Sequence, residues 1–472
     1  MSTANEIEID KIDLKKTDKT DLKKTDKTDL FENIPVPKAV MRLSIPMVIS
    51  SLIMVVYNLA DTFFVGMIHD PIQTSAVTLV APVVLAFNAV VNLAGVGTSS
   101  LISRALGIHD NQTVKKTSAF GFYFAVIAGA LFSVLCTVFK SPLLGILGTG
   151  AENFSATSDY LFWTVTCGAI PSIVSLVTGN IVRAEGMSLH ASIGTISGCI
   201  LNIILDPIFI LPQGLNMGAA GAGCATFISN FVACIYFIIL FIVKKNKMII
   251  SINPAYFRPS VYIIKEVCGV GIPAAVQNLL NVTGMTVLNN FMSEYGTQAV
   301  SAIGIAHKTA MILMYFSMGF GQGIMPLVGY NYSSGNKSRM KEAIIFAVKV
   351  VSGMMLAFTV GFCIFSEEII GMFMKDALVV KYGAAFLIGQ TIAEPFLALD
   401  FLGVGVFQAC GMGKKSFIFA CLRKIVLEIP ALIVLNRIFP MYGLAYAPLV
   451  AEVVLAAASA YELFKIFSNG SE

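Results

Sequence analysis

Long apolar runs recur along this chain, and short breaks rich in Gly, Pro and charged residues separate them. A run of about 20 apolar residues is long enough for a helix to cross the hydrocarbon core of a membrane. The spacing of the runs predicts twelve membrane-spanning helices, so we expect an all-α, multi-pass membrane protein. The predicted spans cover residues 43–66, 76–103, 117–139, 159–183, 188–211, 217–243, 267–293, 299–329, 343–366, 383–409, 416–437 and 441–466.

The second six spans repeat local patterns of the first six, in the same order. Pro46 near the start of the first half has a counterpart in Pro273, and AEGM at 184–187 corresponds to ACGM at 409–412. The repeats predict an internal duplication, with two six-helix lobes related by a pseudo-two-fold axis near the membrane normal. Transporters built from such repeats carry substrate sites between the lobes, which rock to alternate access. The inference from repeated spans to a transport mechanism is an analogy with transporter architecture.

The repeats also set the expected domain boundaries. A charged tail contains the octapeptide DLKKTDKT twice, at 13–20 and 21–28. Its composition is typical of disorder. The expected units are a disordered cytosolic tail, an amino-terminal lobe, a cytosolic linker, a carboxyl-terminal lobe and a short tail, at 1–37, 38–245, 246–265, 266–467 and 468–472.

Basic residues collect in the loops on one side of the predicted bundle. Lys244, Lys245 and Lys247 follow the sixth span, whereas the loops on the opposite side carry few cations. The positive-inside rule therefore predicts that both termini lie in the cytosol. We also expect the chain to span a bacterial plasma membrane.

Composition excludes several classes of protein. Only 13% of the residues are charged and 56% are hydrophobic, which is unlike a soluble domain. The net charge of +4 comes from scattered residues, so we expect no nucleic-acid partner. The nine cysteines form no CxxC pair and are expected to be buried thiols. No nucleophile motif or HExxH pattern is present, so neither an enzyme nor a resident cofactor is expected.

A few polar residues interrupt the apolar runs of the first half. Asn202 and Asp206 stand one helical turn apart and share a helix face, and Asp61 lies in the first span. A charged carboxylate in lipid costs about 3 kcal/mol on insertion scales, so such residues are candidates for function. Together they predict a site for a cation or a proton. Further oxygen donors are expected from Asn180, Ala222 and Thr226, although Asn180 and Thr226 can equally serve to bridge helices.

Other polar positions lie in the second half. Glu394 and Asp400 fall within one span and are candidates to face a substrate cavity, as are Gln277 and Asn278 near the start of the seventh span. Pro46 lacks a backbone N–H, which favours a bend in the first span, with or without a gating role. Glu428 and Glu452 are alternatively expected to pair with Arg423, Lys424 or loop cations.

In combination and order, four motifs resemble the multidrug and toxic-compound extrusion (MATE) family, nearest to its MepA-like bacterial branch. They are IP at 45–46 with YNLADTFFVG at 57–66, NIILDP at 202–207, GAAGA at 218–222 and GYNY at 329–332. The resemblance covers about residues 38–466. It implies two lobes forming a V around a central cavity, and export of drugs in exchange for sodium or protons.

The resemblance also assigns residues. Asp61, Asn202, Asp206, Ala222 and Thr226 match the coupling site of the amino-terminal lobe, with Asn180 in a nearby polar cluster. If sodium is the coupling ion, Asp61, Asn202, Asp206 and Thr226 would ligate Na⁺. Pro46 matches a proline about which the first span is proposed to bend. Members that couple through the other lobe usually carry an acid on span seven, where this chain has Gln277 and Asn278.

The expected function is a monomeric antiporter that exports cationic amphiphilic drugs across the lipid bilayer in exchange for Na⁺ or H⁺. A lipid-linked saccharide flippase of similar architecture would be expected to have extra spans and a cavity lined with Arg or Lys for phosphates. An ion channel would need a filter or rings of like charge, which the pair of aspartates does not supply.

Overall fold

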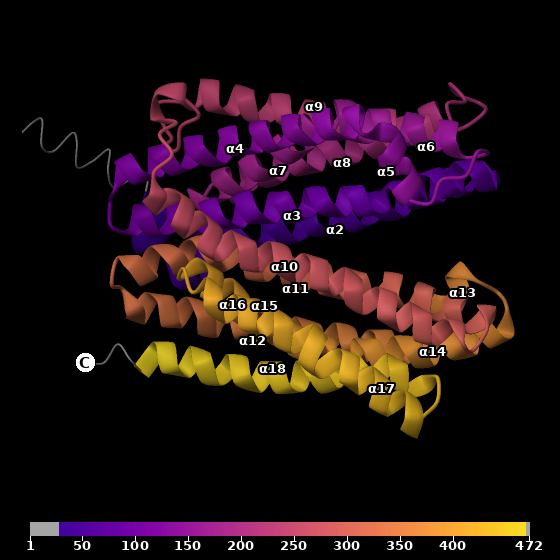
Figure 1. Cartoon of the computed structure of the whole chain (residues 1–472). Helices are drawn as coiled ribbons and strands as arrows, with labels where there is room; N and C mark the ends of the chain where they lie inside the picture. Colours follow the sequence, from indigo (N-terminus) through magenta and orange to yellow (C-terminus); the bar gives the residue numbers. More distant parts are fainter. Residues whose placement is uncertain (1–27, 469–472) are drawn as a thin grey trace, which may run out of the picture.

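The computed structural model describes residues 28–468, and within this range all regular structure is helical (Figure 1). The all-α prediction is therefore confirmed. The helices of the amino-terminal half are α2 (Val36–Gly66), α3 (Pro71–Gly107), α4 (Asn111–Val138), α5 (Lys140–Ile146), α6 (Phe154–Leu161), η1 (Phe162–Cys167), α7 (Ala169–Ala184), α8 (Ser188–Ile210) and α9 (Ala219–Val243). After η2 (Pro254–Tyr256), the carboxyl-terminal half contains α10 (Val261–Ser293), α11 (Thr297–Ser333), α12 (Lys337–Ile364), α13 (Ser366–Phe373), α14 (Ala377–Thr391), α15 (Glu394–Ala409), α16 (Gly413–Cys421), η3 (Leu422–Glu428), α17 (Ile429–Ile438) and α18 (Tyr442–Ser468).

These helices account for the twelve predicted spans. Between residues 28 and 468, nine helices are individually long and apolar enough to cross a membrane, and two bent helix pairs bring the number to eleven. The remaining predicted span corresponds to α16, η3 and α17, which follow one another without a break. Arg423, Lys424 and Glu428 lie in η3, which makes this segment less apolar than the others.

The two bent pairs occupy equivalent places in the two halves. One joins α6 and η1 to α7 with a bend of 48°, and the other joins α14 to α15 with a bend of 41°. Pro171 follows the first break and Pro395 the second. Because proline lacks a backbone N–H, each is suited to a point where the helical hydrogen bonds are interrupted. The matching bends agree with the internal duplication predicted from the repeated motifs.

The amino-terminal half (α2–α9, the N-half) and the carboxyl-terminal half (α10–α18, the C-half) lie side by side (Figure 1). Their ribbons are close together at the end where the described chain starts and stops, near residues 28 and 468, here called the terminal end, and diverge toward the far end. At the terminal end Ser100 Oγ donates to the carbonyl of Gln408 (2.5 Å), and Ser333 Oγ donates to that of Arg104 (2.7 Å). Arg104 also forms an ion pair with Glu266 at 2.9 Å. Direct contacts thus close this end.

Small residues allow the two halves to approach each other. A methyl group added at Gly271 on α10 would lie 2.0 Å from the carbonyl oxygen of Leu93 on α3, and one at Gly97 would lie 2.3 Å from that of Val267. Backbones packed this closely leave no room for a side chain, which is the common use of glycine between membrane helices.

The predicted domain boundaries differ from the structure at two places. Residues 28–37 belong to the tail that was expected to be disordered, yet residues 28–32 are helical and Phe31 is buried. The residues that follow the charged repeats include apolar and hydrogen-bonding groups, and these groups contact the helix bundle. The linker ends earlier than predicted, because α10 begins at Val261. Residues 1–27 and 469–472 lie outside the described residues.

Candidate functional site

Three helices of the N-half bring the predicted polar residues together. Asn202 and Asp206 on α8 are 1% and 0% exposed, and Ala222 on α9 is also fully buried. In the amide orientation that satisfies both of its polar atoms, Asn202 donates to Asp206 Oδ2 (3.0 Å) and accepts from the backbone N–H of Thr226 (3.1 Å). Asn202 therefore links the carboxylate of α8 to the first turns of α9.

Asp61 on α2 completes this cluster. Its charge acts on Asp206 and on the hydroxyl groups of Tyr57 and Tyr160, so these four side chains lie close together. One carboxylate oxygen of Asp61 and one of Asp206 are buried without a hydrogen-bond partner. Buried polar atoms in proteins are normally paired. Unpaired oxygens from two carboxylates in one place indicate a site for a positively charged ligand.

The chemistry of the donors narrows the choice of ligand. Carboxylate, amide and hydroxyl oxygens suit hard cations such as Na⁺, and a carboxylate can instead take up a proton. Among the described residues, no group of three or more His, Cys, Asp or Glu side chains could hold a metal ion. Asp61, Asn202, Asp206 and Thr226 therefore fit a weakly held alkali cation or a proton and do not resemble a transition-metal centre.

Two tyrosines of the cluster are not among the residues that the sequence singled out. The Tyr57 hydroxyl forms a hydrogen bond with the Thr226 side chain, and Tyr160 is 7% exposed. Tyr57 precedes Asp61 by four residues, so the i, i+4 rule could have placed it on the same helix face. Tyr160 comes from α6, and the sequence carries no comparable signal for it.

Asn180 lies apart from this cluster in its bonding. Its side-chain amide donates to the carbonyl of Leu176 (3.1 Å), and its oxygen accepts from Arg183 (2.8 Å). A methyl group on Gly95 of α3 would lie 2.6 Å from the Asn180 amide. Asn180 thus forms hydrogen bonds within α7 and packs on α3. None of these contacts joins it to Asp61 or Asp206.

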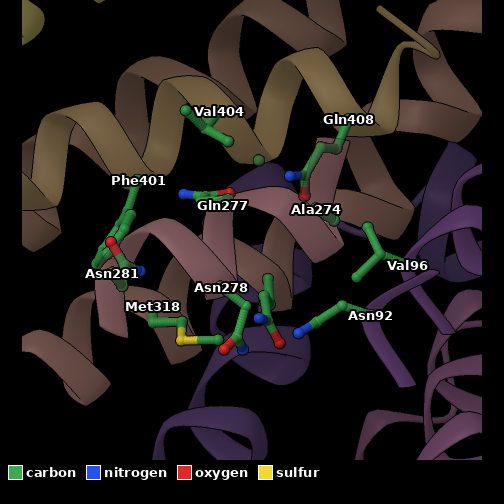
Figure 2. A pocket seen from close by; sticks show the side chains of 12 residues that line it. Asn92, Val96, Ala274, Gln277, Asn278, Asn281, Met318, Phe401, Val404 and Gln408 are labelled. Atoms are coloured by element: carbon green, nitrogen blue, oxygen red, sulfur yellow. The ribbon is translucent and has the colours of Figure 1, made fainter. Parts of the chain in front are cut away.

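A separate cavity lies between the two halves (Figure 2). Asn92 and Val96 of α3 contribute one wall, and α10, α11 and α15 contribute the rest. Gln277 and Asn278, predicted as candidates for a substrate cavity, line it. Half of the twelve described lining residues carry a side-chain amide; the lining consists of Asn92, Val96, Ala274, Gln277, Asn278, Asn281, Met318, Gln322, Phe401, Val404, Gly405 and Gln408. The cavity thus offers amide donors and acceptors beside apolar surface, and none of these twelve described residues is charged.

Glu394 and Asp400 were expected to face such a cavity, but neither is among the described residues that line this one. Asp400 is 0% exposed and forms an ion pair with Arg423, whose Nε also lies 3.1 Å from Glu452. Glu394 is buried within range of the charges of Arg423 and Glu452. The physical reason is that η3 supplies a cation on the buried side of these acids. A buried charge is stabilised by a partner of opposite sign.

This ionic cluster lies directly behind the cavity wall. The Arg423 guanidinium stacks over the Phe401 ring, 4.6 Å from its centroid, and Phe401 lines the cavity. Lys424 and Glu428 form a further ion pair at 2.6 Å. The pairing of Glu428 and Glu452 with Lys424 and Arg423 agrees with the alternative raised from the sequence.

Two lobes of membrane-spanning helices with a cavity between them are the architecture of a membrane transporter. Comparison with known proteins agrees with this class. The family model MatE matches residues 46–208 and 273–434. The chain therefore belongs to the MATE family.

Individual relatives are similar along almost the whole chain. The chain is 34% identical to the multidrug export protein MepA of Staphylococcus aureus strain MRSA252 over 436 residues, covering 91% of this chain and 94% of that protein. The MepA protein of Staphylococcus saprophyticus is also 34% identical, over 437 residues. An outward-facing structure of a multidrug resistance MATE transporter superposes with a TM-score of 0.89 at 24% identity, covering 94% of this chain and 98% of that one.

Proposed function

We propose that this protein exports cationic amphiphilic compounds across the plasma membrane in exchange for Na⁺ or H⁺. The observation that carries the proposal is the buried Asp61–Asp206 pair, whose unpaired oxygens need a cation or a proton. The pair lies within one half, whereas the cavity lies between the halves. Ion and cargo thus have separate sites in this proposal, and movement of the two halves couples them.

The lining of the cavity supports the choice of cargo. Phe401 and Met318 offer aromatic and polarizable surface, and an aromatic face attracts organic cations. The surrounding amides can donate or accept hydrogen bonds, which suits compounds of varied structure. None of the lining residues that the structure describes is Arg or Lys, which argues against a flippase for phosphate-linked saccharides. The similarity to multidrug export proteins agrees with this choice.

The proposed cycle follows from the arrangement of the two sites. With both termini in the cytosol, the terminal end is the cytosolic end and the far end opens to the outside. Cargo enters while the terminal end is open, and an ion from outside then binds at Asp61 and Asp206. Asp61 lies on the same helix as Pro46, so ion binding can change the bend of α2 and help to expel the cargo.

The energy available from the ion is sufficient for export. Each charge moved inward in excess of the charge exported gains about 2.3 kcal/mol from a membrane potential of 100 mV, which corresponds to roughly a fifty-fold concentration ratio. An even exchange with a monovalent cationic cargo is driven by the concentration gradient of the ion. The protein acts as a monomer in this proposal and needs no cofactor besides the coupling ion.

The test is replacement of Asp61 by Asn. Asp61→Asn keeps the size of the side chain but removes its negative charge, so gradient-driven export should fall to background while the protein still reaches the membrane. Ethidium efflux from vesicles, driven separately by an imposed Na⁺ or pH gradient, measures this and also identifies the coupling ion. Wild-type efflux by Asp61→Asn would remove the aspartate from the mechanism.

A matched control is available at the start of α14. Asp376 is exposed and caps this helix by accepting from the N–H groups of Leu378 (2.9 Å) and Val379 (3.0 Å). Asparagine is an equally good cap. Asp376→Asn therefore makes the same chemical change outside both sites and should export at the wild-type rate.

A further inference from the structure

The segment just before α2 lies in the seam between the two halves. Residues 28–35, here called the clasp, include a short helical turn closed by bonds from the backbone N–H groups of Asn33 and Ile34 to the carbonyl of Asp29. Phe31 is 1% exposed, and its ring stacks on that of Tyr330 with centroids 4.9 Å apart and planes 13° apart. A buried aromatic side chain anchors the clasp on the bundle.

The clasp is bonded to the C-half through its backbone. The carbonyl of Phe31 accepts from Arg339 Nε (2.6 Å) on α12 and from Asn331 Nδ2 (3.3 Å) on α11. Arg339 also donates to the carbonyl of Ile34, and the Tyr330 hydroxyl donates to the carboxylate of Glu32. Side chains of α11 and α12 in the C-half thus form hydrogen bonds with Phe31, Glu32 and Ile34 of the clasp.

The same residues also rest on the N-half, to which the clasp is joined covalently through α2. A methyl group at Gly186, in the turn between α7 and α8, would lie 2.9 Å from the side chains of both Leu30 and Phe31. Glu32 lies 3.9 Å from His109, in the turn between α3 and α4. The aromatic ring of Phe31 therefore sits between a turn of the N-half and a helix of the C-half.

We propose that the clasp is a latch that holds the terminal end closed. This inference depends on the proposed exchange between two states, because opening that end moves α11 and α12 away from α2. Phe31 would then leave Tyr330, and the donors of Arg339 would lose the carbonyls of Phe31 and Ile34. The clasp therefore stabilises the state shown here and sets how often the terminal end opens.

A distance measurement tests the latch directly. Gln112 and Lys414 are exposed at the terminal end of the N-half and the C-half, and nitroxide labels there report the separation of the halves. The labels are placed in a variant that lacks the nine native cysteines and unfolds like its parent. Phe31→Ala and Arg339→Gln should each raise the ratio of long to short distances about tenfold.

Controls separate the latch from a general loss of packing. Phe464 is 69% exposed on α18 near the same end, so Phe464→Ala should leave the distances unchanged. If Phe31→Ala and Arg339→Gln both give the wild-type distribution, the latch is wrong.

The result does not depend on the identity of the cargo, because the distances are measured without a drug. If the wild-type protein exports none of the tested drugs but Phe31→Ala still shifts the distances, the latch stands and the proposed export is wrong. If export follows the imposed gradient while neither clasp variant moves the labels, the export proposal stands and the latch fails.

Discussion

Arg423 shows how strongly a single buried charge depends on its surroundings. Its side chain is almost entirely buried between the carboxylates of Asp400 and Glu452, and its guanidinium stacks on Phe401. Removing one member of such a cluster leaves uncompensated charges in a poorly solvated place. The cluster therefore supports the cavity wall, and the stability of the protein depends on each charged side chain in it.

We expect Arg423→Met to destabilise the protein by about 3–5 kcal/mol, because Asp400 and Glu452 lose their shared cation. Unfolding in detergent, followed by circular dichroism, measures the change. Arg437 is exposed on α17, so Arg437→Met should have little effect. Replacing the two acids together with Arg423 by apolar residues should recover much of the loss. Equal stability of Arg423→Met and Arg437→Met would contradict the structural role of the cluster.

The sequence predicted the contacts within helices better than the contacts between them. Asn202 and Asp206 could be placed together because the helical repeat puts i and i+4 on one face. The convergence of Asp61 on them followed only from the family resemblance and the high cost of isolated carboxylates. The ion pair of Asp400 was not predicted, because its partner, Arg423, lies on another helix. Helix periodicity does not say which neighbour packs against a given face.

At the scale of the element, the predicted spans have the right centres, whereas local capping sets their ends. The second span was expected at 76–103, yet α3 runs from Pro71 to Gly107. Asp70 caps it by accepting from the N–H of Ile72 (2.9 Å), and proline suits the first helical position. Hydropathy reports where a helix is buried in lipid and carries little information about the polar turns beyond.

Asp110 offers a test of this capping. It precedes α4, and the hydrogen bonds from the side chain and backbone of Thr113 lower the pKa of its carboxyl group. Because the pKa of Asp110 is lower in the folded than in the unfolded protein, the charged cap stabilises the helix at pH values above the unfolded pKa. This stabilisation is lost as the pH falls through the folded pKa. Asp110→Ala should therefore destabilise the start of α4 by about 1 kcal/mol at neutral pH.

Hydrogen exchange of the first amides of α4 measures this effect. Asp110→Asn should retain most of the protection, since asparagine also caps helices, and it should remove the dependence on pH. The difference between wild type and Asp110→Ala should shrink in acid. A constant difference at every pH would show that the negative charge of Asp110 contributes nothing.

At the scale of the whole molecule, the two halves share a plan but serve different purposes. Both contain an equivalent bent span beside Pro171 or Pro395, and this symmetry was predictable from repeated motifs. Among the described residues, the Asp61–Asp206 pair of the N-half has no cation among its ion pairs, whereas Asp400, Glu452 and Glu428 of the C-half are ion-paired with Arg423 or Lys424; Glu394 is buried beside them without an ion pair of its own. How tightly the halves meet was not predictable, because it depends on which glycines face the opposite backbone.

Gly271 is the position at which this approach can be tested most cleanly. A methyl group there would meet the carbonyl of Leu93 at 2.0 Å, whereas one at Gly269, on the same helix, would have nothing within 4 Å. Gly271→Ala must push α10 away from α3, at a cost of about 1–3 kcal/mol for forcing a methylene-sized group into a packed contact. Because the contact belongs to the closed terminal end, that cost should shift the protein toward the open state by about fivefold to a hundredfold. Gly269→Ala should leave the populations of the open and closed states as they are in the wild type. Labels at Gln112 and Lys414 report both, and equal distances in the two variants would show that the α3–α10 crossing does not control closure.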